Sequence, residues 1–412
     1  MSTKNQKIFL KVFFSLLFIF SVFKIYDNTV SRDAWQYGEW LINYQSGFIR
    51  RGLIGEIIYH LSFIFQNNIA FTTVILVSSI CLIYYKLLYE LFKRVNINYI
   101  WLLLIFSPLI FFFIINTNKI GIHKITILYA FYIYYLLELS KDKFDPKKFT
   151  IIHLILLCSL FIYEVYFFYF PYFILPSLVL ANRTNRKKLF IFYSIFLFLA
   201  IFLMIILYQY KGTADNSLVI CQSLGTFAPM KCEWWGAIGA FSLDYSKGIQ
   251  LAPIENYFFN IIPQKFYMHD DILSYLGFII YLVYALFPFY FFYILSKSRI
   301  KNLKKNIILA IFLIFIFGLP LFHTSEDWLR WFSYHSNLTL YFLIFLVSKK
   351  YINFEKNKKF TEFKNKLNIK LYRNLFIIFL VLYPVFLQHN HFFWKGVRLE
   401  LTIIKMIDKN LD

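Results

Sequence analysis

Residues 189–209, LFIFYSIFLFLAIFLMIILYQ, decide the class of fold, because they contain no charged residue and directly follow the basic run Arg186-Lys187-Lys188. A helix of about 20 apolar residues is long enough to cross a bilayer. The whole chain has this character: it is 59% hydrophobic, with a mean hydropathy of +0.59. Soluble domains contain about 45–50% apolar residues. We therefore expect an all-α, polytopic membrane protein.

The apolar runs predict a transmembrane helical bundle of about eleven spans, forming one membrane domain over residues 1–412. The candidate spans are residues 8–26, 69–92, 99–115, 124–139, 150–163, 166–181, 189–209, 272–296, 307–322, 335–348 and 374–388. Glu164 and Pro171 interrupt residues 150–181, which alternatively form one bent hairpin. The first run lacks a small-residue cleavage site and is expected to remain as a span.

The net charge of +21 is explained by the loops, without a nucleic-acid partner. If the N-terminus is cytoplasmic, the short segments on that side hold most basic clusters, as the positive-inside rule requires. These segments are 1–7, 93–98, 140–149, 182–188, 297–306 and 349–373. The outer segments are 27–68, 116–123, a turn near Glu164, 210–271, 323–334 and 389–412. Two of them, 27–68 and 210–271, are long loops.

Cysteines mark the second long loop. Cys221 and Cys232 lie within it, so a disulfide is expected if the loop faces an oxidising compartment, and two free thiols are the alternative. Cys81 and Cys158 lie in apolar runs and are expected to be inert packing residues.

The first long loop contains residues 46–55, SGFIRRGLIG, with Arg50 and Arg51 on the side where positive charge is disfavoured. Arginine binds phosphate in a bidentate manner, and glycines allow close approach of the backbone. The run therefore predicts a site for a lipid-linked phosphate or pyrophosphate. Alternatively, the arginines pair with a carboxylate of the same loop, Asp33, Glu39 or Glu56, and brace the loop.

Carboxylates of this loop are candidate general bases for a sugar hydroxyl. They are Asp27, Asp33, Glu39 and Glu56. We take Asp33 and Glu56 as the leading catalytic candidates, because Asp33 precedes an aromatic stretch of the kind that stacks on sugars. Salt bridging or solvation is the competing interpretation for each carboxylate.

Three further groups complete the candidate site. Asp327, a third catalytic candidate, and Arg330, a substrate-binding candidate, share one helix face, although an interfacial ion pair is the alternative. His123 and Lys124 lie where the predicted span 124–139 enters lipid, and Lys124 either binds phosphate or snorkels. Glu164 is an acid within an apolar stretch and a candidate partner for one of the arginines.

The sequence contains no motif that indicates a metal site or a cofactor site. His389 and His391 lack a third ligand at a suitable spacing, so no metal is expected. Nucleotide-binding glycine motifs and a nucleophile elbow are missing from the sequence, so no cofactor is expected. In the second loop, Glu233-Trp234-Trp235 and His269-Asp270-Asp271 are candidate contacts to an acceptor sugar.

The run 46–55 resembles a G-F-[VI]-R-R-G-L-[LI]-G signature, and residues 327–331, DWLRW, resemble a D-W-x-R-W motif. Together with the topology, these motifs resemble repeat-unit polymerases of bacterial O-antigens and capsules, the Wzy type. The chain is also similar to GT-C glycosyltransferases, which place an acidic residue in the first outer loop, as Asp27 and Asp33 are placed here.

This resemblance implies transfer of a glycan from undecaprenyl pyrophosphate to a lipid-linked acceptor repeat, at the periplasmic face of a bacterial inner membrane. Arg50 and Arg51 would stabilise the leaving pyrophosphate, and Asp33 or Glu56 would accept the acceptor's proton. The bilayer and a chain-length regulator protein are the other candidate partners. A GT-C transferase that uses a polyprenyl-phosphate sugar and a lipid-linked glycan flippase are the alternative functions.

Overall fold

The computed structural model describes residues 3–107, 109–110, 122–141, 145–180, 183–233, 236–240, 272–299, 303–324, 328–354 and 357–386. Of the predicted site residues, Asp327 lies outside these ranges, as do Trp234, Trp235, the segment 241–271 and the histidines 389 and 391. The described chain is 79% helical, which confirms the predicted all-α class.

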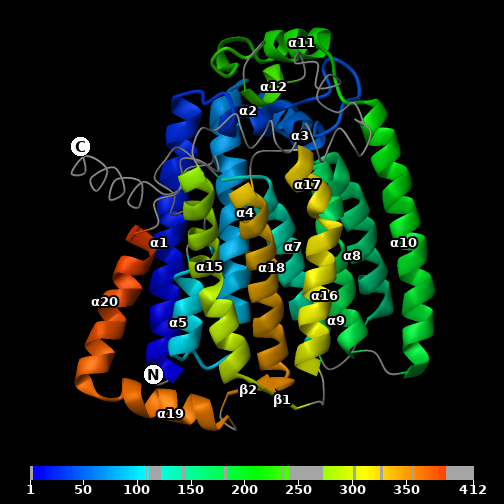
Figure 1. Ribbon diagram of the computed structural model, residues 1–412. Helices are drawn as coiled ribbons and strands as arrows, with labels where there is room; N and C mark the ends of the chain where they lie inside the picture. The colour runs from blue at the N-terminus through cyan, green and yellow to red at the C-terminus, as the bar shows by residue number, and fades with distance from the viewer. Residues whose placement is uncertain are drawn as a thin grey trace.

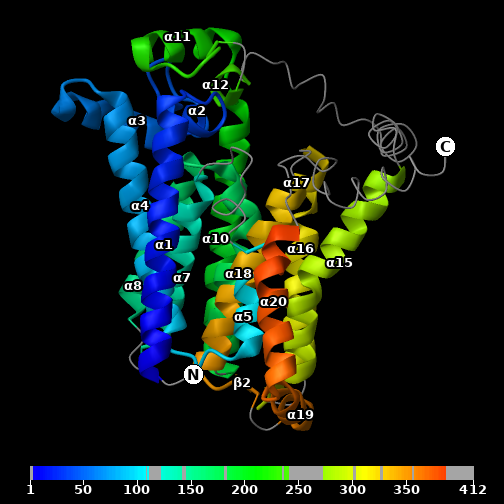
Figure 2. The same cartoon turned by 90° about the vertical axis from the view of Figure 1, so that its left-hand side faces the viewer.

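Long helices run roughly along one axis and form the body of the molecule (Figures 1 and 2). They are α1 (Thr3–Val30), α4 (Ile69–Phe92), α7 (Ile125–Leu139), α10 (Arg183–Gln209), α15 (Ile272–Leu295), α16 (Leu303–Phe317), α18 (Trp328–Ser348) and α20 (Lys370–Phe386). Shorter helices α5 (Tyr99–Ile105), α8 (Pro146–Cys158), α9 (Pro171–Leu180) and α17 (Leu319–Thr324) lie among them.

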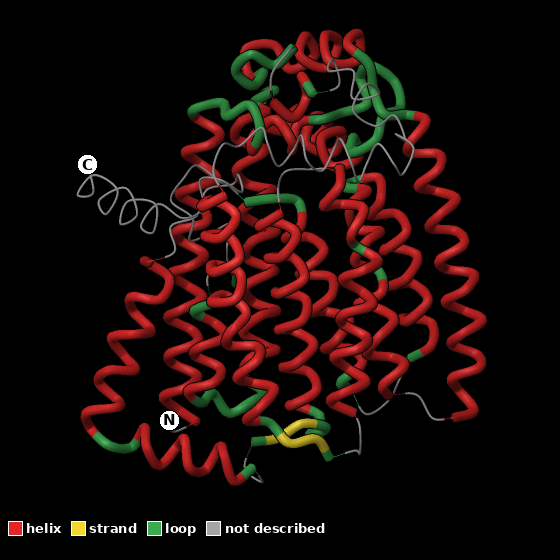
Figure 3. The backbone as a smooth tube through the Cα atoms, in the orientation of Figure 1, coloured by secondary structure: helices red, strands yellow, loops and turns green. Residues whose placement is uncertain are grey.

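Short elements cover the two ends of this body (Figure 1). At one end lie α2 (Gln36–Leu41), α3 (Leu53–Ser62), α11 (Ala214–Leu224) and α12 (Gly236–Gly239). At the other end lie α19 (Lys358–Leu367) and an antiparallel pair, β1 (Lys297–Ser298) and β2 (Ile352–Asn353), drawn in yellow in Figure 3. Single 3-10 turns occur at Phe63–Phe65, Ser159–Phe161, Glu164–Tyr169 and Gly225–Phe227.

Among the described residues, four helical segments are long and apolar enough to cross a membrane: Lys4–Val30, Ile69–Phe92, Lys187–Gln209 and Leu303–Leu321. Only 17% of the most apolar window, within Lys187–Gln209, is buried in the protein, so its side chains need an apolar solvent. Shorter apolar helices include Ile125–Leu139 and Glu164–Leu180. The chain therefore has the character of a helical membrane protein, while the total of about eleven spans stays a prediction.

Residues 146–180 illustrate why apolar runs and spans differ. Helix α8 ends at Cys158, two 3-10 turns follow, and α9 starts only at Pro171. Proline cannot donate a backbone hydrogen bond, so Pro171 begins α9 and does not extend the helix before it. The buried Glu164 needs polar partners and lies in a 3-10 segment between the two helices. The expected interruption at Glu164 and Pro171 is thus present.

Segments predicted to share a side of the membrane lie together. Gln6 exchanges hydrogen bonds with the backbone of Val95 and Ile97, and Lys349 donates to the carbonyl oxygen of Ser140. At the opposite end the two long loops meet, as described below. The assignment of these segments to the cytoplasmic and the outer side of the membrane stays a prediction.

Candidate functional site

A group of charged side chains lies at the end of the molecule that carries α2 and α3. We call it the charged cluster: Glu39, Arg50, Arg51, His123, Lys124, Glu164 and Arg330. Its members come from α2, the turn before α3, the residues preceding α7, the 3-10 turn Glu164–Tyr169 and the start of α18. Six of its seven members, all except Glu39, are among the leading site candidates from the sequence.

Glu164 is the ion-pair partner of both arginines of the first loop. Its two carboxylate oxygens accept hydrogen bonds from Arg51 Nε at 2.9 and 2.8 Å, and Oε1 accepts a further one from Arg51 Nη2 at 2.6 Å. Arg50 Nη1 is more distant, at 3.4 Å from Oε1. The Arg51 guanidinium also lies over the ring of Tyr163, 5.0 Å from its centroid. This bidentate geometry fixes Arg51 more firmly than Arg50.

The backbone holds Arg51 in an uncommon conformation. Its φ is +67°, in the left-handed region that non-glycine residues rarely adopt. The following glycine is required by packing, since a Cβ on Gly52 would lie 2.1 Å from the Tyr44 ring. A Cβ on Gly55 would lie 1.9 Å from the carbonyl oxygen of Ile42. These glycines make room for neighbouring protein atoms, whereas the sequence suggested that they make room for phosphate.

Glu39 and His123 form the second carboxylate contact, with Glu39 Oε2 2.8 Å from His123 Nε2. His123 Nδ1 accepts from the backbone N–H of Ile125 at 3.3 Å and lies 3.0 Å from the Tyr334 hydroxyl. Because a backbone N–H can only donate, Nδ1 carries no proton, and a neutral His123 donates Nε2–H to Glu39. Trp40 Nε1 donates to the Ile122 carbonyl oxygen at 2.9 Å and ties α2 to this segment.

Burial and the neighbouring charges decide the protonation states of Glu39 and His123. Burial lowers the pKa of His123, and the cations of Arg330 and Arg51 lower it further, against the opposing effect of Glu39. Burial would raise the pKa of Glu39, but His123, Lys124 and Arg51 together hold it below its usual range. A charged Glu39 beside a neutral His123 is therefore the stable combination at neutral pH.

Lys124 is completely buried immediately before α7. Its Nζ donates to the carbonyl oxygens of Arg51, at 3.0 Å, and Ile162, at 3.3 Å. Its own carbonyl oxygen accepts from the Tyr166 hydroxyl at 2.6 Å. Lys124 thus joins the arginine turn to the segment that carries Glu164.

Arg330 reaches the cluster from the first turn of α18, with Nη1 3.5 Å from His123 Nε2. Among the described residues, the cluster brings three arginines together with two carboxylates, in addition to Lys124 and His123. Partly buried arginines that lie close together favour an anionic ligand, because their field is poorly screened there.

Asp33 and Glu56 make their hydrogen bonds within the first loop. Asp33 Oδ1 accepts from the backbone N–H groups of Trp35 and Gln36, at 2.9 and 2.6 Å, at the start of α2. Glu56 accepts from the backbone of Tyr44 at 2.8 Å, and from the side chains of Gln45 and His60 at 2.9 Å each. Both carboxylates stabilise the loop that carries the arginines, and their catalytic roles stay a hypothesis.

The second long loop covers the first. Met230 and Ala237 donate backbone hydrogen bonds to the carbonyl oxygens of Arg32 and Ala34, at 2.9 Å each. The Arg50 N–H donates to the Tyr210 carbonyl oxygen, also at 2.9 Å.

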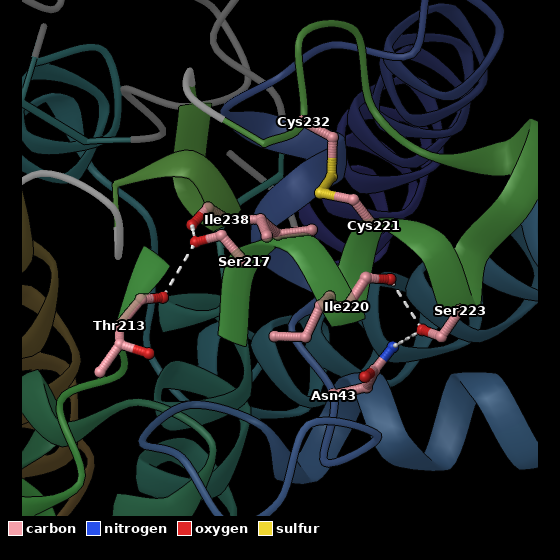
Figure 4. Close-up of a disulfide and its surroundings, with 8 residues drawn as sticks. All are labelled: Asn43, Thr213, Ser217, Ile220, Cys221, Ser223, Cys232 and Ile238. Atoms are coloured by element: carbon pink, nitrogen blue, oxygen red, sulfur yellow. Dashed lines mark hydrogen bonds between the residues drawn. A yellow bond between two sulfur atoms is a disulfide. The ribbon is translucent and has the colours of Figure 1, made fainter. Parts of the chain in front are cut away.

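Cys221 and Cys232 form a disulfide that closes this covering segment, which confirms the expected bond (Figure 4). Beside it, Ser217 donates to Ile238, and Asn43 of the first loop donates to Ser223 (Figure 4). The covering segment, residues 210–240, therefore positions the backbone around Arg50.

Glu39 is the site residue that sequence reasoning failed to single out among the loop carboxylates. No spacing marks it, since its partner His123 belongs to a distant segment. Within the described ranges, no group of three or more His, Cys, Asp and Glu side chains is arranged to hold a metal ion. No family model matches the chain, and no curated protein or solved structure is significantly similar to it, so the cluster is interpreted from its own geometry.

Proposed function

We propose that the chain is a membrane glycosyltransferase that polymerises lipid-linked oligosaccharide repeat units, such as those of an O-antigen or capsule. The observation that carries this proposal is the gathering of Arg50, Arg51 and Arg330 with Lys124 at the end of apolar helices where two long loops meet. A polyprenyl pyrophosphate matches both properties, since its chain is lipid and its head group is a multiple anion.

In the proposed reaction a hydroxyl group of the acceptor repeat attacks the anomeric carbon of the donor glycan. The bond between that carbon and the pyrophosphate oxygen breaks, and undecaprenyl pyrophosphate leaves. Arg50, Arg51 and Arg330 stabilise the charge that develops on it, while a carboxylate takes the hydroxyl proton. Asp33, Glu56 and Asp327 are candidate bases from the sequence, and Glu39 joins them because it lies in the cluster.

The proposed setting is the bacterial inner membrane, with the N-terminus in the cytoplasm and the charged cluster at the periplasmic face. Both substrates are then already on the side of the cluster, and the membrane supplies them. A chain-length regulator is a proposed protein partner. The disulfide of the covering segment is compatible with this side, because the periplasm is oxidising.

Deletion of the gene in its native host tests the polymerase. The expected result is loss of the polysaccharide ladder on a gel, leaving a single capped repeat, and an intact ladder would refute the function. Arg51→Lys and Arg330→Gln should also abolish the ladder while the protein stays in the membrane. Arg373→Gln is the matched control, because Arg373 is exposed in the first turn of α20, a helix that follows α19 at the opposite end.

A GT-C transferase is the second candidate, since Glu39, a member of the charged cluster, lies in the first loop after α1. Purified protein with defined donors separates the two activities. Chains of repeats made from pyrophosphate-linked oligosaccharide indicate the polymerase, and single sugars added from a polyprenyl-phosphate donor indicate the transferase. Movement of the lipid across vesicles without either product would indicate a flippase.

A further inference from the structure

Lys124 combines features that a phosphate ligand would not need. Its side chain has no exposed surface, and its Nζ is directed at two backbone carbonyl oxygens. A phosphate-binding lysine presents its ammonium group to the ligand as a point charge. The neighbouring arginines remain 25–29% exposed and are better placed to meet an anion.

The acceptor of the shorter Lys124 bond is the carbonyl oxygen of Arg51, the residue with the left-handed backbone. Such a conformation is unfavourable for a residue with a Cβ and persists only where its surroundings hold it. Glu164 and the Tyr163 ring hold the Arg51 side chain. Lys124 holds the backbone of the same residue.

The second acceptor, Ile162, connects this bond to the other half of the ion pair. Ile162 directly precedes Tyr163 and Glu164, which both contact Arg51. One ammonium group therefore sets the distance between the segment that carries the guanidinium and the segment that carries its carboxylate. Bonds from a charged donor are stronger than neutral ones, so the protonation of Lys124 affects both segments.

We propose that Lys124 is a positioning residue: its ammonium group holds Arg51 in the left-handed conformation and at Glu164, and so presents the arginines to a pyrophosphate that Lys124 itself does not touch. The part of this inference that concerns the ligand rests on the proposed function. The part that concerns the backbone does not, and the two parts are tested separately.

Lys124 is present in both its charged and its neutral form near neutral pH. Burial lowers its pKa to about 7; Glu39 and Glu164 oppose this shift, and Arg51 reinforces it. These groups face Lys124 from α2, the 3-10 turn at Glu164 and the arginine turn, and the neighbouring His123 is neutral at this pH. A bound anion would favour the charged lysine, so ligand binding is expected to be accompanied by proton uptake.

The backbone test compares hydrogen–deuterium exchange in the full-length wild type, Lys124→Met and Lys141→Met. Lys141 is a matched control, because it follows the other end of α7 and its side chain is 55% exposed. We expect amides of residues 50–56 to exchange about tenfold faster in Lys124→Met and to be unchanged in Lys141→Met. Unchanged exchange in Lys124→Met would overturn the positioning role.

If Lys124→Met fails to fold, the wild type alone decides the backbone question. The local opening that exchanges these amides leaves Lys124 buried but without its carbonyl acceptors, which lowers the pKa of Lys124 in the open state below that in the closed state. After correction for the intrinsic pH dependence of exchange, protection of residues 50–56 should therefore fall as the pH rises through about 7, while protection of α18 should not. Protection of residues 50–56 that stays constant across this range would overturn the proposal.

The ligand test titrates inorganic pyrophosphate into the same three proteins in detergent micelles. Lys124→Met should bind about tenfold more weakly, and its affinity should fall less steeply than that of the wild type between about pH 6 and pH 8. The titration of pyrophosphate itself is common to all three proteins, so the difference isolates Lys124.

Three other outcomes of the ligand test have distinct meanings. Weaker binding with unchanged exchange would mean that Lys124 contacts the anion directly, which would overturn the proposal. Identical affinities and pH profiles in Lys124→Met and the wild type would overturn it while leaving the proposed function intact. A wild type that binds no pyrophosphate would overturn the proposed function, and the exchange comparison would then decide the backbone role alone.

Discussion

Replacing Glu164 with glutamine should destabilise the protein mainly through Arg51 and much less through Arg50. Arg51 makes three hydrogen bonds of 2.6–2.9 Å to the carboxylate, whereas Arg50 makes one of 3.4 Å. Glu164 is only 11% exposed, so its removal leaves a partly buried guanidinium without its counter-charge. Losing one partner of a buried pair costs about 3–5 kcal/mol, and exposed pairs contribute about 0–1 kcal/mol.

The expected loss for Glu164→Gln lies at the lower end of the buried range, about 3 kcal/mol, since Arg51 is 25% exposed. A double-mutant cycle divides this loss between the arginines. We expect a coupling of about 2 kcal/mol between Glu164 and Arg51, and less than about 1 kcal/mol between Glu164 and Arg50.

The measurement is reversible unfolding by SDS in mixed micelles, followed by far-ultraviolet circular dichroism, with Arg51→Gln and Arg50→Gln as the single variants. Equal couplings for the two arginines would refute the geometric argument. So would a loss below about 1 kcal/mol for Glu164→Gln, because that value is typical of a solvated pair.

Removing the disulfide with Cys221→Ser and Cys232→Ser should lower the free energy of unfolding by about 3 kcal/mol, the loop-closure entropy for a sequence separation of 11. Protease cleavage within residues 210–240 should then be faster than in the wild type, and an unchanged cleavage rate would contradict this prediction. Gly55→Ala should cost at least the upper end of about 1–3 kcal/mol, because its Cβ would meet the Ile42 carbonyl oxygen. Gly47→Ala, with φ +95° but open space, should cost only about 1 kcal/mol in the same unfolding assay. The pKa of Lys124 is about 7 in the folded protein and 10.5 ordinarily, so between pH 7 and pH 10.5 the unfolded chain binds more protons than the folded one. The stability of the wild type should therefore rise with pH over this range relative to that of Lys124→Met. Parallel pH profiles of the two proteins would refute the lowered pKa of Lys124.

Local signals in the sequence were sufficient for the class of fold and for several members of the cluster. Long uncharged apolar runs indicate membrane-spanning helices from their composition alone. A carboxylate within such a run needs a polar partner, so Glu164 could be expected to pair with one of the arginines. The cysteine pair is close in sequence, so its disulfide could also be expected. These inferences depend on composition and on short separations.

Contacts between distant segments were not accessible in this way. Glu39 differs from Asp33 and Glu56 only through its contact with His123, which depends on how α2 packs against the residues before α7. The structural roles of Asp33 and Glu56 likewise follow from the path of the loop backbone. The sequence predicts Lys124 as a phosphate ligand or a snorkelling residue, and it does not reveal which carbonyl oxygens the buried ammonium group meets.

The segments that form the charged cluster are synthesised at widely separated times. About 290 residues separate Glu39 from Arg330, so at 5–20 residues per second the last arginine follows the first carboxylate by about 15–60 seconds. During that interval the first loop emerges before His123 and Glu164, its partners, and before the segment around Met230 that covers it. The first loop is therefore present for a time without the residues that later pair with its charged side chains, and it must not aggregate during that time. A chain truncated anywhere before α18 would lack Arg330 and would have an incomplete cluster.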